Sequence, residues 1–198
     1  VRFNCPVGPY TTFRVGGKAE ALCGVKDLLQ LKDLLSFVSK ESLPFLVVGK
    51  GSNLLVRDGG LKGIVLLLEG ELEGVEEKDG TIHAGGGLGL SELVRFSHKK
   101  GLAGLEFLAG IPGTVGGAVA MNAGAWGRST GEALTAVEIL TATGERITKR
   151  SAELQFGYRK ALLPAGSVVV KAWFKGSPDS PARARFRSVA AGILSCAR

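Results

Sequence analysis

The sequence predicts an α+β fold in two lobes, for two reasons. Segments with strand-like composition outnumber those with helical spacing, and the helices are not regularly interposed between strands, which argues against a doubly wound Rossmann sheet. Two turn sequences, Lys78-Asp79-Gly80 and Thr143-Gly144, each separate a pair of strand-like segments and therefore predict β-hairpins.

The first lobe is expected over about residues 1–70. Residues 19–25 predict a short strand, and residues 26–39 predict a helix. The helix carries four apolar residues on one face, namely Leu28, Leu31, Leu35 and Val38. Buried strands are predicted over residues 44–48 and 64–68, which completes a β-α-β-β unit.

The second lobe is expected over about residues 71–176. Its strands are predicted over residues 73–77, 81–84, 136–141, 146–148 and 167–174. Its helix is expected to begin at Ser91, which can cap the first turn, and to run to about Lys100 before Gly101. The stretch 176–181 is typical of a linker, so residues 177–198 are expected to be a linker and the truncated start of a further domain.

Glycine is unusually frequent, at 30 of 198 residues, which is about twice the average usage of roughly 7%. Twenty-one of the 30 lie between Gly49 and Gly131 and follow no Gly-X-Y period, which excludes collagen. With 45% hydrophobic residues the chain is also too apolar for a disordered glycine linker. Many backbone positions are therefore expected to need positive φ or close approach by another group.

The formal charge of +7 is concentrated after residue 170, where six basic residues accompany one acid. No aromatic interleaving or helix-turn-helix pattern accompanies them, so we expect no nucleic-acid partner. Cys5, Cys23 and Cys196 form no C-x-x-C pair and are expected to be free thiols in a reducing cytoplasm. No apolar run reaches the roughly 20 residues of a membrane helix. No secretion signal is evident, and the missing initiator Met indicates an incomplete or trimmed chain.

A glycine-containing loop directly follows the strand at 44–48 and reads Gly49-Lys50-Gly51-Ser52-Asn53-Leu54. Successive backbone N–H groups, with the Ser52 hydroxyl and the Asn53 amide, form the kind of nest that binds phosphate oxygens. The loop does not match the Walker A pattern G-x-x-x-x-G-K-[ST]. A tight turn between two buried strands is the alternative interpretation.

The longest motif runs from Gly110 to Gly127 and contains six glycines and Pro112. Because few side chains project from such a stretch, a flat or charged ligand can lie against bare backbone, which indicates a cofactor site. Glycine-rich packing between the two lobes is the alternative. The run 85–89 lacks the last glycine of G-x-G-x-x-G and predicts a strand-to-helix turn rather than a Rossmann phosphate loop.

Few other residues indicate chemistry. The stretch 156–160 places Arg159 beside Gly157 and Tyr158, where its guanidinium can hold a substrate carboxylate with two hydrogen bonds. Neither His83 nor His98 has a second histidine or a carboxylate at metal-ligand spacing, so we expect no metal site. The G-x-S-x-G motif of a nucleophilic serine is absent from the sequence.

Taken together, these stretches resemble the UDP-N-acetylenolpyruvoylglucosamine reductase family of bacterial cell-wall synthesis, from about Tyr10 to Phe174. The stretches that carry the resemblance are 11–17, 49–56, 104–118, 121–127 and 156–159. The resemblance implies a two-lobed α+β FAD-binding domain of the vanillyl-alcohol-oxidase (PCMH) type over residues 1–176.

The resemblance also implies a reaction and its residues. In that family NADPH reduces FAD, which passes a hydride to the enolpyruvyl double bond of a UDP-sugar, a cytoplasmic step of peptidoglycan precursor synthesis. Arg159 matches the family residue that stabilises negative charge on the substrate, and Tyr158 would shape the substrate pocket. The implied cofactor-binding residues are Gly49, Lys50, Gly51, Ser52, Asn53, Leu54, Gly110, Ile111, Pro112, Gly113, Thr114, Val115, Gly116, Gly117, Ala118, Asn122, Gly124, Ala125, Trp126 and Gly127.

Two departures from the family pattern matter. Ala161 stands where the family has a serine, so a hydroxyl near Arg159 is lost. The family also continues into a substrate domain with a proton-donating serine and a late glutamate, and neither motif is found before Arg198. We therefore expect a chain that binds FAD but is catalytically incomplete. The alternatives are another flavin oxidoreductase of the same fold, and a flavin-free interaction module that uses the basic tail.

Overall fold

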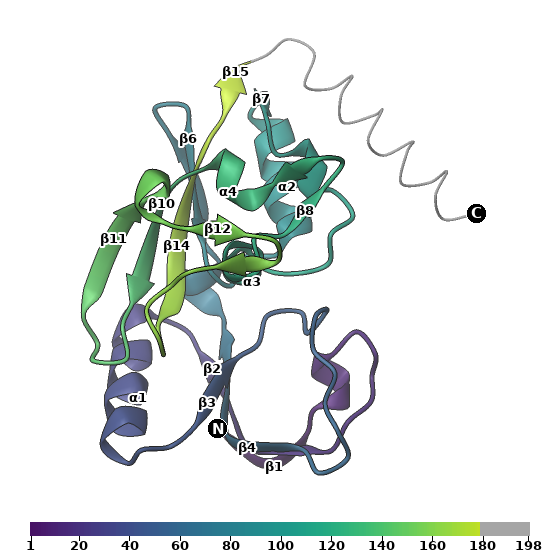
Figure 1. The fold of residues 1–198 in the computed structure, drawn as a ribbon, viewed down its shortest axis with the longest axis vertical. Coiled ribbons are helices and arrows are strands. Elements are labelled where there is room, and N and C mark those ends of the chain that lie inside the picture. The colour runs from purple at the N-terminus through teal and green to yellow at the C-terminus, as the bar shows by residue number, and fades with distance from the viewer. Residues whose placement is uncertain (179–198) are drawn as a thin grey trace.

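The structure is a computed structural model that describes residues 1–178, and two β-sheets organise it. In Figure 1 the five-stranded sheet stands above the four-stranded sheet, and helix α1 (Leu28–Lys40) lies beside both. The α+β class predicted from the strand and helix patterns is confirmed. No helix among residues 1–178 is long and apolar enough to cross a membrane.

The four-stranded sheet combines antiparallel and parallel pairing in the order β1-β2-β4-β3. Its strands are Arg2–Pro6 (β1), Lys18–Val25 (β2), Phe45–Val47 (β3) and Leu61–Leu68 (β4). Asp27 caps α1 by accepting a 2.8 Å hydrogen bond from the Gln30 N–H. The predicted β-α-β-β unit is confirmed. Strand β1 is not among the strands predicted from the sequence, and it pairs antiparallel with β2.

The five-stranded sheet is antiparallel throughout, in the order β11-β10-β14-β6-β5. Its strands are Val75–Lys78 (β5), Thr81–Gly85 (β6), Leu134–Leu140 (β10), Arg146–Arg150 (β11) and Val168–Lys175 (β14). Both predicted hairpins are confirmed. Asp79 and Gly80 have φ values of 52° and 74°, as a two-residue turn of matching twist requires.

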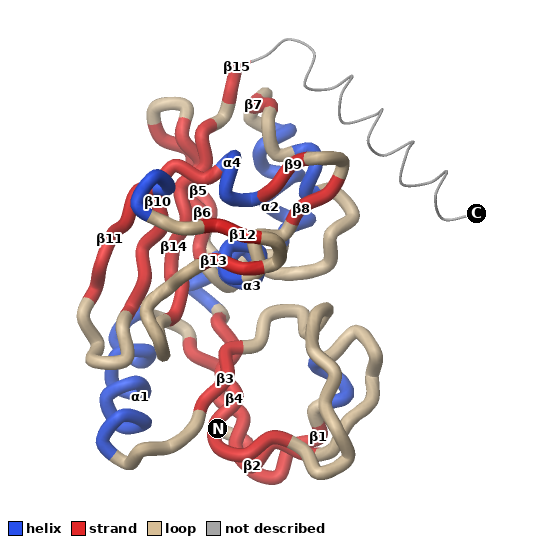
Figure 2. The backbone as a smooth tube through the Cα atoms, in the orientation of Figure 1, coloured by secondary structure: helices blue, strands red, loops and turns tan. Residues whose placement is uncertain are grey.

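Short elements complete the described chain. The remaining helices are Leu90–Lys99 (α2), Val115–Ala120 (α3) and Thr130–Ala133 (α4), with single 3₁₀ turns at Gly8–Tyr10, Gly70–Glu73, Glu106–Leu108 and Ser151–Glu153. Three two-stranded ribbons pair Leu102–Ala103 (β7) with Ser177–Pro178 (β15), Gly124–Ala125 (β8) with Arg128–Ser129 (β9), and Phe156–Gly157 (β12) with Lys160–Ala161 (β13). Figure 2 shows these ribbons and their connecting loops beside α2 and α3.

Two expectations about helices are wrong. Helix α2 begins at Leu90, after Gly89, and Ser91 makes no cap. The entry of α2 is instead fixed by backbone pairing with a distant segment, because the Leu90 N–H donates to the Gly113 carbonyl at 3.0 Å. The glycine-rich stretch 110–127 is also not bare loop throughout, since it contains α3, whose Val115 and Val119 are fully buried.

The core joins both sheets through α1 and β14. Leu31 and Leu35 of α1 share a buried cluster with Leu66 of β4 and with Val168 and Val170 of β14. Val169, on the opposite face of β14, packs in the cluster that contains α2 and α3. One strand therefore connects the two largest apolar clusters, which positions α3 relative to the first sheet.

Two predictions fall partly or wholly outside the described residues. Cys5 and Cys23 are free thiols, as expected, whereas Cys196 lies outside residues 1–178. Of the six basic residues after position 170, Lys171 and Lys175 lie in β14, and the other four lie outside the described residues. Half of the predicted linker 176–181 also lies outside them, and in the described half Ser177–Pro178 is a strand paired with β7 rather than a free linker.

The packing of α1 supplies a stability test. Leu35→Ala should lower the free energy of unfolding by about 2–5 kcal/mol, because the side chain is 1% exposed and its loss leaves a cavity. Leu29→Ala is the matched control in the same helix, since Leu29 is 69% exposed. Urea denaturation of both variants measures the difference. Equal destabilisation by the two substitutions would contradict the packing described for α1.

Candidate functional site

A cavity of about 860 Å³ opens where three segments meet: the loop after β3, the segment that leads into α3, and the β12–β13 hairpin. This volume lies within the range of about 300–1,000 Å³ that is common for ligand sites. Most of the residues predicted to bind a cofactor or substrate line it, although they come from segments about 60 to 100 positions apart. The predicted residues that line it are Gly49, Lys50, Gly51, Ser52, Asn53, Leu54, Ile111, Pro112, Gly113, Thr114, Gly117, Ala118, Asn122, Gly124, Ala125, Gly127, Tyr158 and Arg159.

Four predicted residues do not line this cavity. Val115 is fully buried in the core, and its N–H donates to the Leu88 carbonyl at 2.8 Å. The Gly116 N–H likewise donates to the Gly86 carbonyl at 2.8 Å. Trp126 stands at the β8–β9 turn with 55% of its surface exposed, and Gly110 precedes the lining residues. The backbone N–H groups of Val115 and Gly116 are therefore engaged within the protein.

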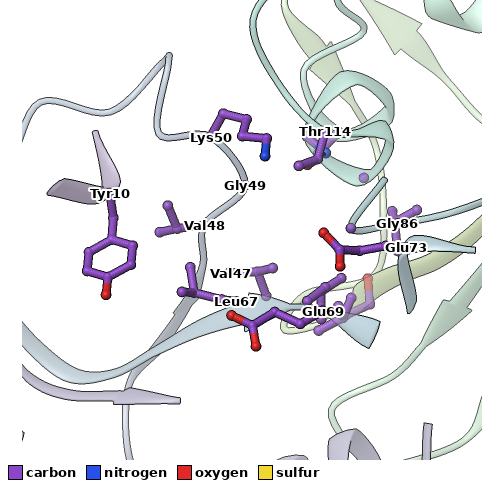
Figure 3. A pocket seen from close by; sticks show the side chains of 18 of the residues that line it. Tyr10, Val47, Val48, Gly49, Lys50, Leu67, Glu69, Glu73, Gly86 and Thr114 are labelled. Carbon is purple, nitrogen blue, oxygen red and sulfur yellow. The ribbon is translucent and has the colours of Figure 1, made fainter. Parts of the chain in front are cut away.

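A smaller cavity of about 340 Å³ adjoins the first one. Gly49, Lys50, Thr114 and Gly117 line both cavities, so these residues stand between them. Figure 3 shows Gly49 and Lys50 on one side of the smaller cavity and Thr114 on the other. The two cavities therefore adjoin at these residues.

The loop after β3 and the residues before α3 carry a row of hydrogen-bond donors along the larger cavity. Among residues 1–178, the backbone N–H groups of the six residues from Gly49 to Leu54 have no hydrogen-bond partner, and the same holds for Gly113 and Thr114. Buried backbone N–H groups almost always find a partner, and Gly51 in this run is buried, whereas Gly49, Lys50 and Asn53 are exposed. The run therefore leaves donors free for a bound group along the cavity. Such a row suits an anion with several acceptor oxygens, such as a diphosphate.

The position of this row depends on a close contact between the two sheets. A Cβ atom on Gly49 would lie 2.4 Å from Thr114 Oγ1, so a larger residue does not fit there without movement. Ser52 Oγ donates a 2.6 Å hydrogen bond to the Pro112 carbonyl, which fastens the same loop a second time. In this structure the Ser52 hydroxyl holds the loop, and its expected role toward a ligand stays a prediction.

Arg159 occupies the turn of the β12–β13 hairpin together with Tyr158. The register pairs Gly157 with Lys160, which leaves Tyr158 and Arg159 as the two turn residues. Arg159 has a φ of 54°, a left-handed conformation that costs an L-residue roughly 1–2 kcal/mol. Its Nη2 donates a 2.9 Å hydrogen bond to Asn53 Oδ1. Tyr158 is 93% exposed, so its ring borders the cavity without packing in the core.

Sequence reasoning missed several polar residues of the cavity. Arg128, Ser129 and Glu132 line it from β9 and α4, directly after the predicted stretch 122–127. The Arg128 guanidinium lies over the Phe107 ring at 5.0 Å, and Ser129 Oγ lies 2.9 Å from Glu132 Oε1. The only sequence feature that could have indicated these residues is their position directly after the glycine-rich stretch. The β8–β9 turn is what brings them back to the cavity.

A family model for an FAD binding domain matches residues 19–149. The chain belongs to this FAD binding domain family. The resemblance expected from the motifs is also confirmed: the chain is 43% identical over 180 residues to a UDP-N-acetylenolpyruvoylglucosamine reductase of Paramagnetospirillum magneticum, covering 91% of this chain and 58% of the relative. A reductase of the same name from Streptococcus agalactiae is 38% identical, with coverage of 90% and 59%.

A solved structure agrees with these relatives. The crystal structure of the UDP-N-acetylenolpyruvylglucosamine reductase from Thermus caldophilus superimposes with a TM-score of 0.83 at 39% identity, covering 94% of this chain and 66% of that one. The chain thus spans about three-fifths of the length of the curated relatives. The α+β FAD-binding fold is confirmed, and FAD is the cofactor of this domain.

The residues of the site fit this cofactor. FAD carries a diphosphate between an adenosine half and a flavin half. The residues with open N–H groups line the larger cavity, and Gly49, Lys50 and Thr114 also line the smaller one. No group of three or more His, Cys, Asp or Glu side chains within residues 1–178 is arranged to hold a metal ion.

The Gly49 contact predicts the effect of one methyl group. Gly49→Ala should destabilise the FAD-loaded chain by about 1–3 kcal/mol and weaken FAD retention, because the loop must move away from Thr114. Gly59→Ala is the control, since a Cβ there meets nothing within 4 Å. Thermal unfolding with and without FAD measures both effects. Identical behaviour of the two variants would show that the contact does not set the loop position.

Proposed function

We propose that this chain is the FAD-binding part of an oxidoreductase that uses NADPH to reduce UDP-N-acetylglucosamine enolpyruvate to UDP-N-acetylmuramate, in peptidoglycan precursor synthesis. The name shared by the similar reductases supports this substrate, and the cavity that joins an open row of N–H groups to Arg159 supports the site. The chain alone is incomplete for the reaction, consistent with its spanning about three-fifths of its relatives.

The domain organisation follows from this proposal. Residues 1–176 would form the FAD-binding domain, with one lobe built on each sheet and the division near residue 70, between β4 and β5. Residues 177–198 would be the linker and the beginning of a substrate-binding segment. The reaction would take place in the cytoplasm, where the nucleotide-linked precursors are made.

The N–H row is proposed to hold the diphosphate of FAD. The N–H groups of Gly49–Leu54, Gly113 and Thr114 would supply hydrogen bonds to the negatively charged oxygens. Lys50 also lines both cavities and adds a positive charge beside this row. The two cavities would then receive the adenosine and flavin halves.

Arg159 is proposed as the residue that stabilises negative charge on the substrate. When bound, FAD supplies a hydride to one carbon of the enolpyruvyl double bond. The neighbouring carbon and its carboxylate then carry negative charge, and a fixed guanidinium in a shielded site lowers the energy of that state. Asn53 holds the Arg159 guanidinium at the edge of the cavity, and Tyr158 would shape the entrance for the substrate. The proton donor would come from the segment that this chain lacks.

Two other functions make different predictions. A flavin oxidoreductase with another substrate would oxidise NADPH without needing the enolpyruvyl UDP-sugar, in a protein that carries this chain with the further segment of its relatives. An interaction module would bind oligonucleotides with a steep salt dependence that is lost on deletion of residues 177–198. Membership of the FAD binding domain family argues against the second alternative.

The proposed diphosphate site predicts discrimination among flavins. The purified chain should show flavin absorbance and bind FAD more tightly than FMN or riboflavin by on the order of a hundredfold or more, because the shorter flavins lack the diphosphate or the adenosine half. Quenching of flavin fluorescence measures the three affinities. Equal affinity for riboflavin and FAD would contradict the assignment of the N–H row to a diphosphate.

The proposed role of Arg159 predicts a selective kinetic loss. In a protein that carries this chain with the further segment of its relatives, Arg159→Lys should lower kcat about 10²–10³-fold, because an ammonium cannot reproduce the fixed two-pronged guanidinium. Flavin reduction by NADPH should change little. Arg150→Lys, on β11 outside the cavity, is the matched control. Retained turnover in Arg159→Lys would exclude the role.

A further inference from the structure

The β12–β13 hairpin that presents Arg159 is too short to hold its own position. Each strand has two residues, and isolated two-stranded hairpins are marginal in water. Its turn adds little packing, because Tyr158 is almost fully exposed and Arg159 is itself exposed. Contacts from outside the hairpin must therefore decide where the guanidinium stands.

Asn122 supplies one such contact, although sequence reasoning assigned it to the cofactor. Both ends of its side-chain amide are engaged with the protein: Nδ2 donates to the Gly157 carbonyl at 3.1 Å, and Oδ1 accepts from the Gly131 N–H at 2.9 Å. Its φ of 41° is left-handed, a conformation that asparagine tolerates better than most residues. Asn122 thus connects the end of α3 and the beginning of α4 to the residue before the Tyr158-Arg159 turn.

Asn53 supplies a second contact from the other sheet. Its Oδ1 accepts the hydrogen bond from Arg159 Nη2, and its Nδ2 lies 3.7 Å from the Met121 sulfur, next to Asn122 in the chain. The contacts close a ring: Arg159 to Asn53, Asn53 to Met121, and Asn122 back to the Arg159 turn. The ring fixes the guanidinium relative to both sheets.

We propose that Asn122 and Asn53 are positioning residues for Arg159, Asn122 by holding the hairpin turn and Asn53 by holding the guanidinium. This inference rests on the proposed role of Arg159. Both residues come from the glycine-rich motifs. Asn122 lies 37 positions and Asn53 lies 106 positions before Arg159, the side chain that they would position.

Asn122→Asp tests the first contact with almost no change in size. The variant keeps the acceptor for the Gly131 N–H but places a carboxylate oxygen against the Gly157 carbonyl, so the hairpin loses this contact while Phe156 still packs against the core. In the FAD-loaded chain, amide hydrogen exchange over residues 155–162 should accelerate about tenfold, while exchange in β2 stays unchanged. Asn4→Asp is the matched control, because Asn4 is also left-handed, at φ 47°, and lies in β1 outside the cavity.

The NMR signals of the Arg159 guanidinium test positioning directly. If Asn122 and Asn53 only stabilised the fold, substituting them would leave these signals unchanged. Asn122→Asp should shift these signals although Asn122 does not touch the guanidinium. Asn53→Ala should speed rotation of the guanidinium, whereas Asn53→Asp should slow it by forming an ion pair. If Asn122→Asp does not fold, the opposite effects of the two Asn53 variants, at an exposed side chain, carry the test.

The outcomes separate the inference from the proposed function. Unmoved Arg159 signals and unchanged hairpin exchange in Asn122→Asp, with FAD retained, would overturn the positioning role. Equal effects of Asn53→Ala and Asn53→Asp on guanidinium rotation would overturn the second contact. Failure of the proposed function would instead appear in the unmodified sequence, as absent FAD binding or as full turnover of Arg159→Lys.

Discussion

The contact between Gly49 and Thr114 is the constraint on which the site depends. It brings the loop after β3 of the first sheet against the residue that precedes α3, beside the second sheet, at a distance that a Cβ atom on Gly49 would not permit. Beside this contact, the backbone N–H groups of Gly49–Leu54 and of Gly113 and Thr114 have no hydrogen-bond partner among residues 1–178. The contact therefore places the loop and its open donors beside the beginning of α3.

The glycine excess has two separate causes, and the alternatives suggested by the sequence each apply at some positions. Gly49 and Gly86 permit close packing, since a Cβ on Gly86 would lie 2.1 Å from the Val169 carbonyl oxygen. Gly127 has no neighbour within 4 Å of such an atom and φ of 74°, so it serves a turn at the edge of the cavity. Glycine-rich packing and an open ligand site are therefore neighbouring parts of one arrangement.

The parts of the candidate site that lie in one continuous motif were predictable from the sequence. The parts that the fold brings together from separate segments were not. The loop Gly49–Leu54 and the Arg159 turn were found from short patterns, and both line the cavity. Val115 shares a motif with the lining residues, but α3 directs its side chain into the core. The Gly116 N–H is engaged by the Gly86 carbonyl, whereas Gly116 itself lines the smaller cavity. Arg128 and Glu132 belong to no motif that marks them in the sequence. They line the cavity because the short β8–β9 ribbon turns the chain back toward it.

The sequence by itself determined the elements whose periodicity is local: the buried face of α1, the Asp79-Gly80 turn, the valine-rich strand β14 and the order of the family motifs. Only the tertiary structure decided where α2 begins, that Val115–Ala120 is helical and that Asn53 reaches Arg159 across 106 positions. The physical reason is the range of the forces involved. Apolar spacing and turn residues act over a few positions, whereas backbone pairing at Gly113 and the Asn53–Arg159 hydrogen bond join segments that are distant in the chain and meet only in the packed fold.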